Sequence, residues 1–208
     1  MQKFKVKDVV TTIKGESPRA GYPVLQIELA PRASRKISVG ELLSIVKESV
    51  GEKILFTGKP FRQIPVLSQF FKEYDLDKEV IIETTGRVPE HCNRRSYLVP
   101  IVSRGFLVIS PTLQGIKKGH YRWLNSYRID NYVWKFKWLG SEQKTISFMK
   151  MFFRLVTKKS IYEEIEKNKV IVVPSDVNNI EECKKVWDFC IVYRLRYSGR
   201  EYRRLWVK

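Results

Sequence analysis

The sequence predicts a single α/β domain whose mainly parallel sheet is covered by helices. Short segments rich in β-branched and aromatic residues alternate with longer segments whose apolar residues recur at helical spacing. Strands that alternate with helices are typical of a parallel sheet with the helices packed on its outside. The 208 residues suffice for one domain with a sizeable core. We therefore expect residues 1–208 to form one domain, with residues 192–208 as its basic C-terminal segment.

In the first half of the chain, strand and helix signals follow one another closely. Residues 1–8 alternate charged and apolar side chains, as a strand does. Ser38, with Glu41 three residues later, makes a capping box, which predicts that a helix begins there. The further elements predicted in this half are strands over 24–29, 53–56 and 80–82 and a helix over 63–74.

The second half repeats the alternation around a long basic loop that follows residue 109. We expect Trp134, Phe136 and Trp138 to enter the core from one strand and Lys135 and Lys137, between them, to face water. The elements predicted in this half are strands over 105–109, 132–138 and 170–173, a helix capped by Ser141, a helix over 180–189 and an extended segment over 193–206.

Short motifs in the first half carry a resemblance to a known family. They are TTIKGE at 11–16, GYPVLQIEL at 21–29, FTGKP at 56–60, IETTG at 82–86 and ISP at 109–111. In this order and at these intervals they resemble 7-carboxy-7-deazaguanine synthase, a small radical S-adenosylmethionine (SAM) enzyme. Its members carry T-x-Q-G-E-G, a strand ending in a cysteine loop, T-G-G-E-P, E-T-N-G-T and S-P-K. The resemblance implies a partial (β/α) barrel of about six mainly parallel strands, with a basic loop and a C-terminal extension.

The residues on which the chemistry of that family depends are absent. In the family, three cysteines after the first barrel strand hold a 4Fe–4S cluster, because thiolates suit such clusters. Here residues 28–36 contain no cysteine, and Cys92, Cys183 and Cys190 lie far downstream without the spacing of a cluster motif. The family's T-G-G-E-P turn binds the SAM amino group, whereas residues 57–60 read TGKP, and a lysine repels another ammonium group. We therefore expect no cofactor and a pseudoenzyme.

Several retained residues leave two interpretations open. In the first, they line a vestigial purine or pterin pocket. In the second, Gly15 and Gly86 serve turns that need a positive φ, and Glu83 ends a strand without binding a ligand. We favour the second, because each short motif is weak by itself. The residues concerned are Gly15, Glu16, Thr57, Gly58 and Glu83.

The net charge of +17 is unevenly distributed along the chain. Residues 87–160 hold 15 Lys and Arg against three acids, a net charge of +12, and residues 192–208 hold six against one, a net charge of +5. The rest of the chain is neutral, with 18 basic and 18 acidic side chains. A surface of one sign repels itself unless a polyanion meets it. The distribution therefore predicts a polyanionic partner.

Cations and aromatic residues alternate in residues 117–128 and 200–206, and a third basic segment covers residues 91–95. RNA recognition uses this mixture, because cations hold phosphates while aromatic rings stack on unpaired bases. We expect all of these segments to be loops or termini. The residues predicted to contact RNA are Arg94, Arg95, Lys117, Lys118, His120, Tyr121, Arg122, Trp123, Tyr127, Arg128, Arg200, Tyr202, Arg203, Arg204 and Trp206.

Other classes of site have no support in the sequence. His91 and His120 are not spaced as metal ligands, and the chain lacks H-E-x-x-H and C-x-x-C spacing, a Walker P-loop and a nucleophile elbow. We expect no metal and no catalytic residue. No apolar run is long enough to span a membrane, and the N-terminus lacks the apolar core of a secretory signal. The unpaired cysteine spacing favours a reducing compartment, and we expect the cytoplasm.

Together these observations predict a non-catalytic RNA-binding protein on a degenerate radical SAM scaffold. A structural component of a ribonucleoprotein such as the ribosome fits this size and charge, with ribosomal RNA and ribosomal proteins as partners. Two alternatives stay open. The first is a 7-carboxy-7-deazaguanine synthase-like enzyme or substrate-binding subunit, and the second is a DNA-binding accessory protein.

Overall fold

The structure, a computed structural model, describes residues 3–13, 22–127, 129, 131–157 and 160–198. Its strands are β1 (Lys3–Ile13), β2 (Pro23–Leu29), β3 (Lys36–Ser38), β4 (Lys53–Gly58), β5 (Glu79–Thr84), β6 (Phe106–Ile109), β7 (Tyr132–Lys137), β8 (Val170–Val173) and β9 (Arg196–Tyr197). Its α-helices are α1 (Val39–Glu48), α2 (Ile64–Glu73), α3 (Arg95–Arg104), α4 (Leu113–Lys117), α5 (Glu142–Phe152), α6 (Ile161–Glu166) and α7 (Ile180–Val192). Short 3-10 helices are η1 (Pro60–Gln63), η2 (Glu90–Cys92) and η3 (Arg122–Ser126), and η4 (Phe153–Thr157) is a π-helix.

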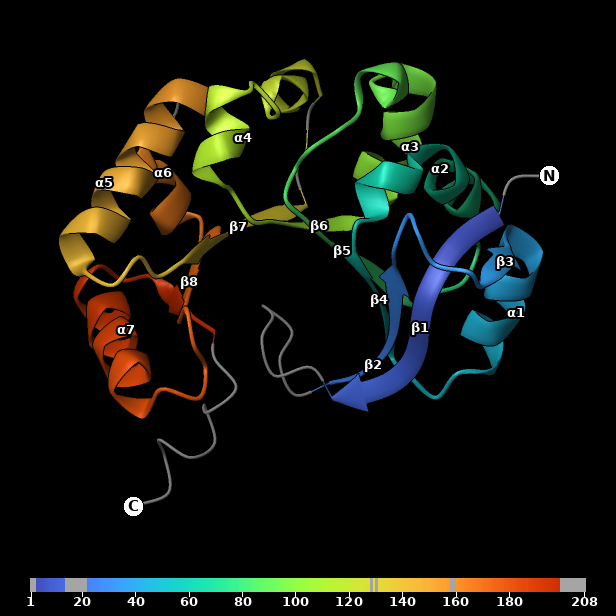
Figure 1. The fold of residues 1–208 in the computed structure, drawn as a ribbon, viewed down its shortest axis with the longest axis horizontal. Helices are drawn as coiled ribbons and strands as arrows, with labels where there is room; N and C mark the ends of the chain where they lie inside the picture. The colour runs from blue at the N-terminus through green and yellow to red at the C-terminus, as the bar shows by residue number, and fades with distance from the viewer. Residues whose placement is uncertain (1–2, 14–21, 128, 130, 158–159, 199–208) are drawn as a thin grey trace.

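The described strands form one nine-stranded sheet in the order β3-β1-β2-β4-β5-β6-β7-β8-β9. From β2 to β9 every neighbouring pair is parallel, whereas β1 runs antiparallel to both β2 and β3. Figure 1 shows the sheet curving through the middle of the molecule with the helices along its outside. This partial (β/α) barrel confirms the predicted fold class, since six parallel strands, β2 and β4 to β8, carry the curve and β9 adds a short edge.

The predicted caps are present where two helices begin. The Ser38 side chain accepts a hydrogen bond from the Glu41 backbone N–H, and the Glu41 carboxylate accepts one from the Ser38 N–H at 2.7 Å. These bonds from Ser38 lower the pKa of Glu41. Ser141 caps α5 by accepting from the Lys144 N–H. Both helix starts were therefore readable from a few neighbouring residues.

Some elements lie where the sequence predicts loops or no element. Helix α3 begins at Arg95 without a side-chain cap and contains Pro100, so it lacks the usual sequence signals of a helix. The predicted long basic loop after residue 109 contains α4 and η3, and α6 also went unpredicted. The N-terminal strand runs on to Ile13. In the predicted extended segment over 193–206, β9 covers two residues, and the chain beyond 198 lies outside the described residues.

The two faces of the sheet carry different cores. The outer face packs against the helices and includes Trp134 and Phe136, and Trp138 is buried with them, as predicted. The inner face carries a smaller apolar cluster formed by strand residues alone: Val24, Leu55, Ile81, Val108, Val133, Ile171 and Val173. Side chains alternate along a strand, so the next inner-face positions toward the C-terminal ends are polar. They include Glu28 on β2, Thr57 on β4 and Glu83 on β5.

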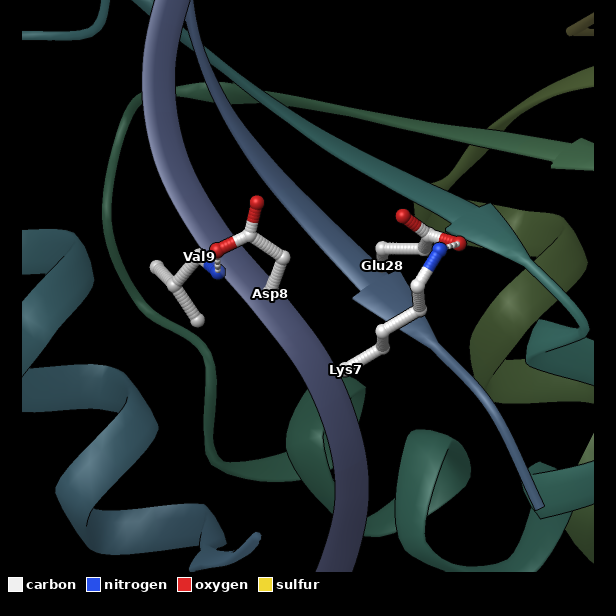
Figure 2. A network of polar contacts seen from close by, with 4 residues as sticks. All are labelled: Lys7, Asp8, Val9 and Glu28. Atoms are coloured by element: carbon white, nitrogen blue, oxygen red, sulfur yellow. Dashed lines mark hydrogen bonds and ion pairs between the residues drawn. The ribbon is translucent and has the colours of Figure 1, made fainter. Parts of the chain in front are cut away.

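The pairing of β1 with β2 brings opposite charges together beside this polar rim. The β1 register shifts between Val6 and Asp8, which is a β-bulge. Figure 2 shows the Lys7 ammonium reaching the Glu28 carboxylate at 2.9 Å, while the Asp8 carboxylate accepts from the Val9 backbone N–H. Glu28 is therefore paired with a cation from the neighbouring strand.

Helix α6 is fixed to β7 by a fully buried carboxylate. Glu164 Oε2 accepts hydrogen bonds from the Tyr132 hydroxyl at 2.8 Å and from Trp134 Nε1 at 2.9 Å.

Among the described helices, none is long and apolar enough to cross a membrane.

Candidate functional site

The C-terminal ends of the parallel strands meet along one edge of the sheet. Open and barrel-shaped parallel sheets bind their ligands at this edge. The loops that follow β4, β5, β6 and β8 there begin with Lys59, Thr85, Ser110 and Pro174. This edge is therefore the first place to look for a site.

Trp123 joins three segments at this edge. Its indole Nε1 donates to the Gly86 carbonyl oxygen at 2.7 Å, in the loop after β5. Its ring packs edge-on against Phe61 of η1, with ring centroids 5.6 Å apart. The side chain is 2% exposed. Trp123 thereby holds η3 against the segments that follow β4 and β5.

Tyr121 makes a second connection in the same place. Its hydroxyl accepts a hydrogen bond from the Thr112 N–H at 2.8 Å, after β6, and its ring packs edge-on against Phe152. A Cβ at Gly86 would lie 2.7 Å from the Tyr121 ring, and one at Gly115 would lie 2.6 Å from its hydroxyl. Glycine is therefore required at both positions for the ring to fit.

The prediction that Tyr121 and Trp123 stack on RNA bases is wrong for this fold. Both side chains are 2% exposed, and their rings contact protein groups. Burying an aromatic ring removes a large apolar surface from water, and these two rings find partners for their polar atoms as well. The rings of Tyr121 and Trp123 thus build the edge, and Lys117 and Lys118 nearby are exposed on its surface.

The cations gather around His120. Burial lowers the pKa of His120, and the positive charges of Arg87, Lys118 and Arg62 lower it further. These three cations come from the loop after β5, the end of α4 and η1, and all are exposed. Among the residues that the structure describes, no carboxylate contributes to the shift. We call Arg62, Arg87, Lys118 and His120 the His120 cluster.

Other residues predicted to bind RNA lie in several places. Arg94 and Arg95 are exposed at the start of α3, and Lys117 is exposed at the end of α4. Tyr127 is half-buried, with its ring centroid 6.4 Å from that of Trp123. The Arg122 backbone belongs to η3, and its side chain is not among those described. The predicted contacts that lie outside the described residues are Arg128, Arg200, Tyr202, Arg203, Arg204 and Trp206.

The glycine turn after β4 is explained by contacts within the chain. Gly58 has a φ of +78°, and a Cβ there would collide with the Leu29 carbonyl oxygen. That same oxygen accepts a hydrogen bond from the Lys59 N–H at 2.8 Å. Thr57 is buried. Gly86 also has a positive φ, of +77°. Turn geometry thus accounts for both glycines, while Gly15 and Glu16 lie outside the described residues.

Glu83 lies beside a cavity of about 460 Å³ at the ends of β6, β7 and β8. The Lys135 ammonium, from β7, is 3.6 Å from Glu83 Oε1. The prediction that Lys135 faces water is wrong, because its side chain is only 15% exposed on the inner face, whereas Lys137 is exposed as predicted. The cavity is lined by Thr85, Ser110, Pro111, Thr112, Lys135, Lys137, Val173, Pro174, Ser175, Asp176 and Val177.

The residues present do not fit an iron–sulfur cluster. The turn after β2 is closed by a hydrogen bond from the Ala33 N–H to the Ala30 carbonyl and leads into β3, and it contains no cysteine. Cys92 in η2 and Cys183 and Cys190 in α7 are buried. Burial raises the pKa of Cys92, and that of Cys190 to about 12, which disfavours the thiolates that clusters need. In the described part of the chain, no group of three His, Cys, Asp or Glu could hold a metal ion.

No family model and no curated protein matches this sequence. The structure is similar to the crystal structure of QueE from Escherichia coli, with a TM-score of 0.59 over 94% of this chain and 93% of that chain. This chain has a QueE-like fold. At 15% sequence identity the likeness shows the fold alone. The QueE-like fold spans the second half of the chain as well, where the motif resemblance fades.

Proposed function

We propose that this protein is a non-catalytic RNA-binding protein on a radical SAM-like scaffold. The observation that carries the proposal is the His120 cluster, whose exposed cations come from separate segments, two of which Trp123 joins at one edge of the sheet. Like charges gathered in one place raise the energy of the folded protein unless a polyanion binds there. An RNA backbone supplies that charge.

The contacts beneath the cluster support this proposal. Arg62 follows Phe61 and Arg87 follows Gly86, and Trp123 contacts both Phe61 and Gly86. The backbones that carry these cations are therefore fixed before any partner arrives. A surface arranged in advance loses less conformational freedom on binding.

The shape of the edge favours RNA over duplex DNA. Readers of the DNA major groove insert a helix or a two-stranded ribbon. Here the cations stand on loops, a short 3-10 helix and the end of the five-residue helix α4. Structured RNA is recognised through its shape and its backbone, which suits such a surface. We propose the cytoplasm as the compartment and a ribonucleoprotein such as the ribosome, with ribosomal proteins as neighbours, as the setting.

The test is the salt dependence of RNA binding. A triple variant, Arg62→Gln, Arg87→Gln and Lys118→Gln, removes the exposed charges of the cluster. The control, Lys47→Gln, Lys72→Gln and Lys185→Gln, removes three exposed cations from α1, α2 and α7. The dissociation constant for a folded RNA is measured between about 50 and 200 mM salt.

The logarithm of the binding constant falls linearly with the logarithm of the salt concentration, and each lost phosphate contact makes this slope shallower by about 0.7 to 0.9. We expect the salt slope of the cluster variant to be shallower than that of the unchanged protein by about two. The control variant should have the same slope as the unchanged protein. Equal slopes for all three proteins would contradict the proposal. Competition between folded RNA and duplex DNA at fixed salt tests the DNA-binding alternative, which predicts that the protein binds duplex DNA more tightly than RNA.

Sedimentation of a cell lysate at moderate salt tests the ribosomal setting. We expect the protein to travel with ribosomal particles. If it remains at the top of the gradient, the ribosome is not its partner. The RNA-binding proposal is then tested by the salt slopes of the variants alone.

A further inference from the structure

The inner-face cavity contains a cation whose hydrogen-bonding groups are largely unused. Lys135 lines this cavity with a side chain that is 15% exposed. Among the described residues its one partner is the Glu83 carboxylate at 3.6 Å, which is beyond hydrogen-bond distance. An ammonium group carries three donors, and burying charged donors without acceptors is costly. Lys135 Nζ is not fully enclosed, so its donors are open to an acceptor within the cavity.

Lys137 adds a second positive charge to the same cavity. Residues two apart on a strand share a face, so Lys135 and Lys137 stand about 6.6 Å apart along β7. Lys137 is exposed, and it lines the cavity beside the loop that follows β8. One oxyanion could contact both ammonium groups from this side of the sheet.

The acidic groups on the β8 side are already engaged. Both oxygens of Glu182 accept from the Ser175 hydroxyl, and Oε1 also accepts from the Ser175 and Asp176 N–H groups. Burial raises the pKa of Glu182, yet these bonds, with the charge of Lys137, lower it overall. Asp176 Oδ1 accepts from the Asn178 N–H at 2.9 Å. Both carboxylates, that of Glu182 on α7 and that of Asp176 in the loop, thus accept hydrogen bonds from the loop itself, and the two lysines are cationic donors that line the cavity.

We propose that this cavity binds an oxyanion, a phosphate or carboxylate group, between Lys135 and Lys137. The volume of about 460 Å³ lies within the usual range of small-ligand pockets, about 300 to 1,000 Å³. The hydroxyls of Thr85 and Ser110 at the cavity wall can bind the polar remainder of the ligand. The residues that line the cavity include none of the four residues of the His120 cluster, and the proposal does not depend on RNA binding at that cluster.

The test uses inorganic phosphate and adenosine 5′-monophosphate as probes, at constant ionic strength. Backbone amide NMR signals of Ser110, Thr112 and Ser175 are followed during each titration. We expect saturable shifts in the unchanged protein. Lys135→Gln and Lys137→Gln weaken binding at least tenfold, Lys135→Arg retains it, and Lys47→Gln, on α1, leaves it unchanged.

The absence of saturable shifts at these amides, or equal affinity for the unchanged protein and Lys137→Gln, would overturn the proposal. Because Lys137 is exposed, its variant should fold even if loss of the Lys135 charge beside Glu83 disturbs the sheet. The double variant Lys135→Gln with Glu83→Gln removes both charges of that pair and gives a second folded comparison.

The oxyanion can belong to a free small molecule or to the end of a bound RNA. Two copies of one RNA, with and without a 5′-phosphate, distinguish these sources. If Lys135→Gln weakens binding of the phosphorylated copy alone, the RNA end occupies the site. If Lys135→Gln binds both copies equally but no longer binds phosphate or adenosine 5′-monophosphate, a free small molecule occupies the site. The cluster variant should still bind phosphate, so failure of one proposal is distinguishable from failure of the other.

Discussion

At the scale of single residues, His120 reports on the charge of its surroundings. Burial and the nearby cations Arg87, Lys118 and Arg62 lower its pKa. The folded protein therefore binds fewer protons at His120 than the unfolded chain does, at pH values between the lowered pKa and the ordinary value of about 6.5. Through this residue, stability is lost as the pH falls through that window.

A bound polyanion should reverse this shift. We expect the pKa of His120 to rise when RNA binds, because phosphate charge offsets the cations, and to rise also in the free Arg87→Gln variant. NMR titration of the two histidine rings measures both effects, with His91→Gln assigning the signals. If RNA binds and the pKa of His120 does not change, the polyanion sits elsewhere on the protein.

At the scale of elements, one ring organises the edge of the sheet. Tyr121 lies against Gly86 and Gly115, and its hydroxyl accepts from the Thr112 N–H. The loops after β5 and β6 therefore depend on the close approach of backbone and ring.

A pair of glycine substitutions tests this packing. Gly86→Ala forces a side chain into a positive φ and against Tyr121, and we expect a loss of more than about 1 kcal/mol in unfolding free energy. Gly40→Ala, in the first turn of α1, meets nothing within 4 Å and should be neutral or stabilising by up to about 1 kcal/mol. Urea unfolding measures both. Equal effects at the two sites would mean that the Tyr121 contact carries no stability.

At the scale of the whole molecule, the positive charge is concentrated in part of the chain, whereas the sheet is built from strands inside and outside that part. Residues 87–160, with their net charge of +12, supply α3 to α5 and strands β6 and β7, yet these strands belong to one sheet with strands from outside this segment. The QueE-like fold covers both halves. The concentration of positive charge in residues 87–160 is therefore compatible with this fold.

The missing cluster ligands give a prediction for the whole protein. After anaerobic reconstitution with iron and sulfide, we expect no stoichiometric iron–sulfur absorption band, because residues 28–36 contain no cysteine and the cysteines elsewhere are buried. Conversion of a carboxy-tetrahydropterin in the presence of SAM is the second measurement. Either a stoichiometric band or turnover would favour the enzyme alternative.

Sequence patterns predicted most elements because their signals are local. Ser38 with Glu41, the alternation of Trp134 with Phe136, and the apolar spacing in α2 each involve residues a few positions apart. Helices α3 and α4 were missed, since one contains a proline and the other has five residues. In the candidate site, Lys118 and His120 were predicted, whereas Arg62 and Arg87 were not, because they come from segments far apart in the sequence.

The sequence by itself determined the α/β class, the helix caps, the absence of cluster cysteines and the uneven net charge, because each depends on composition or on near neighbours. Only the tertiary structure decided that Trp123 and Tyr121 are buried, that separate cations meet at His120 and that Lys135 faces a cavity. The physical reason is that a run of mixed cations and rings does not specify which side faces water. Contacts with distant residues, such as that of Trp123 with Gly86, make that choice.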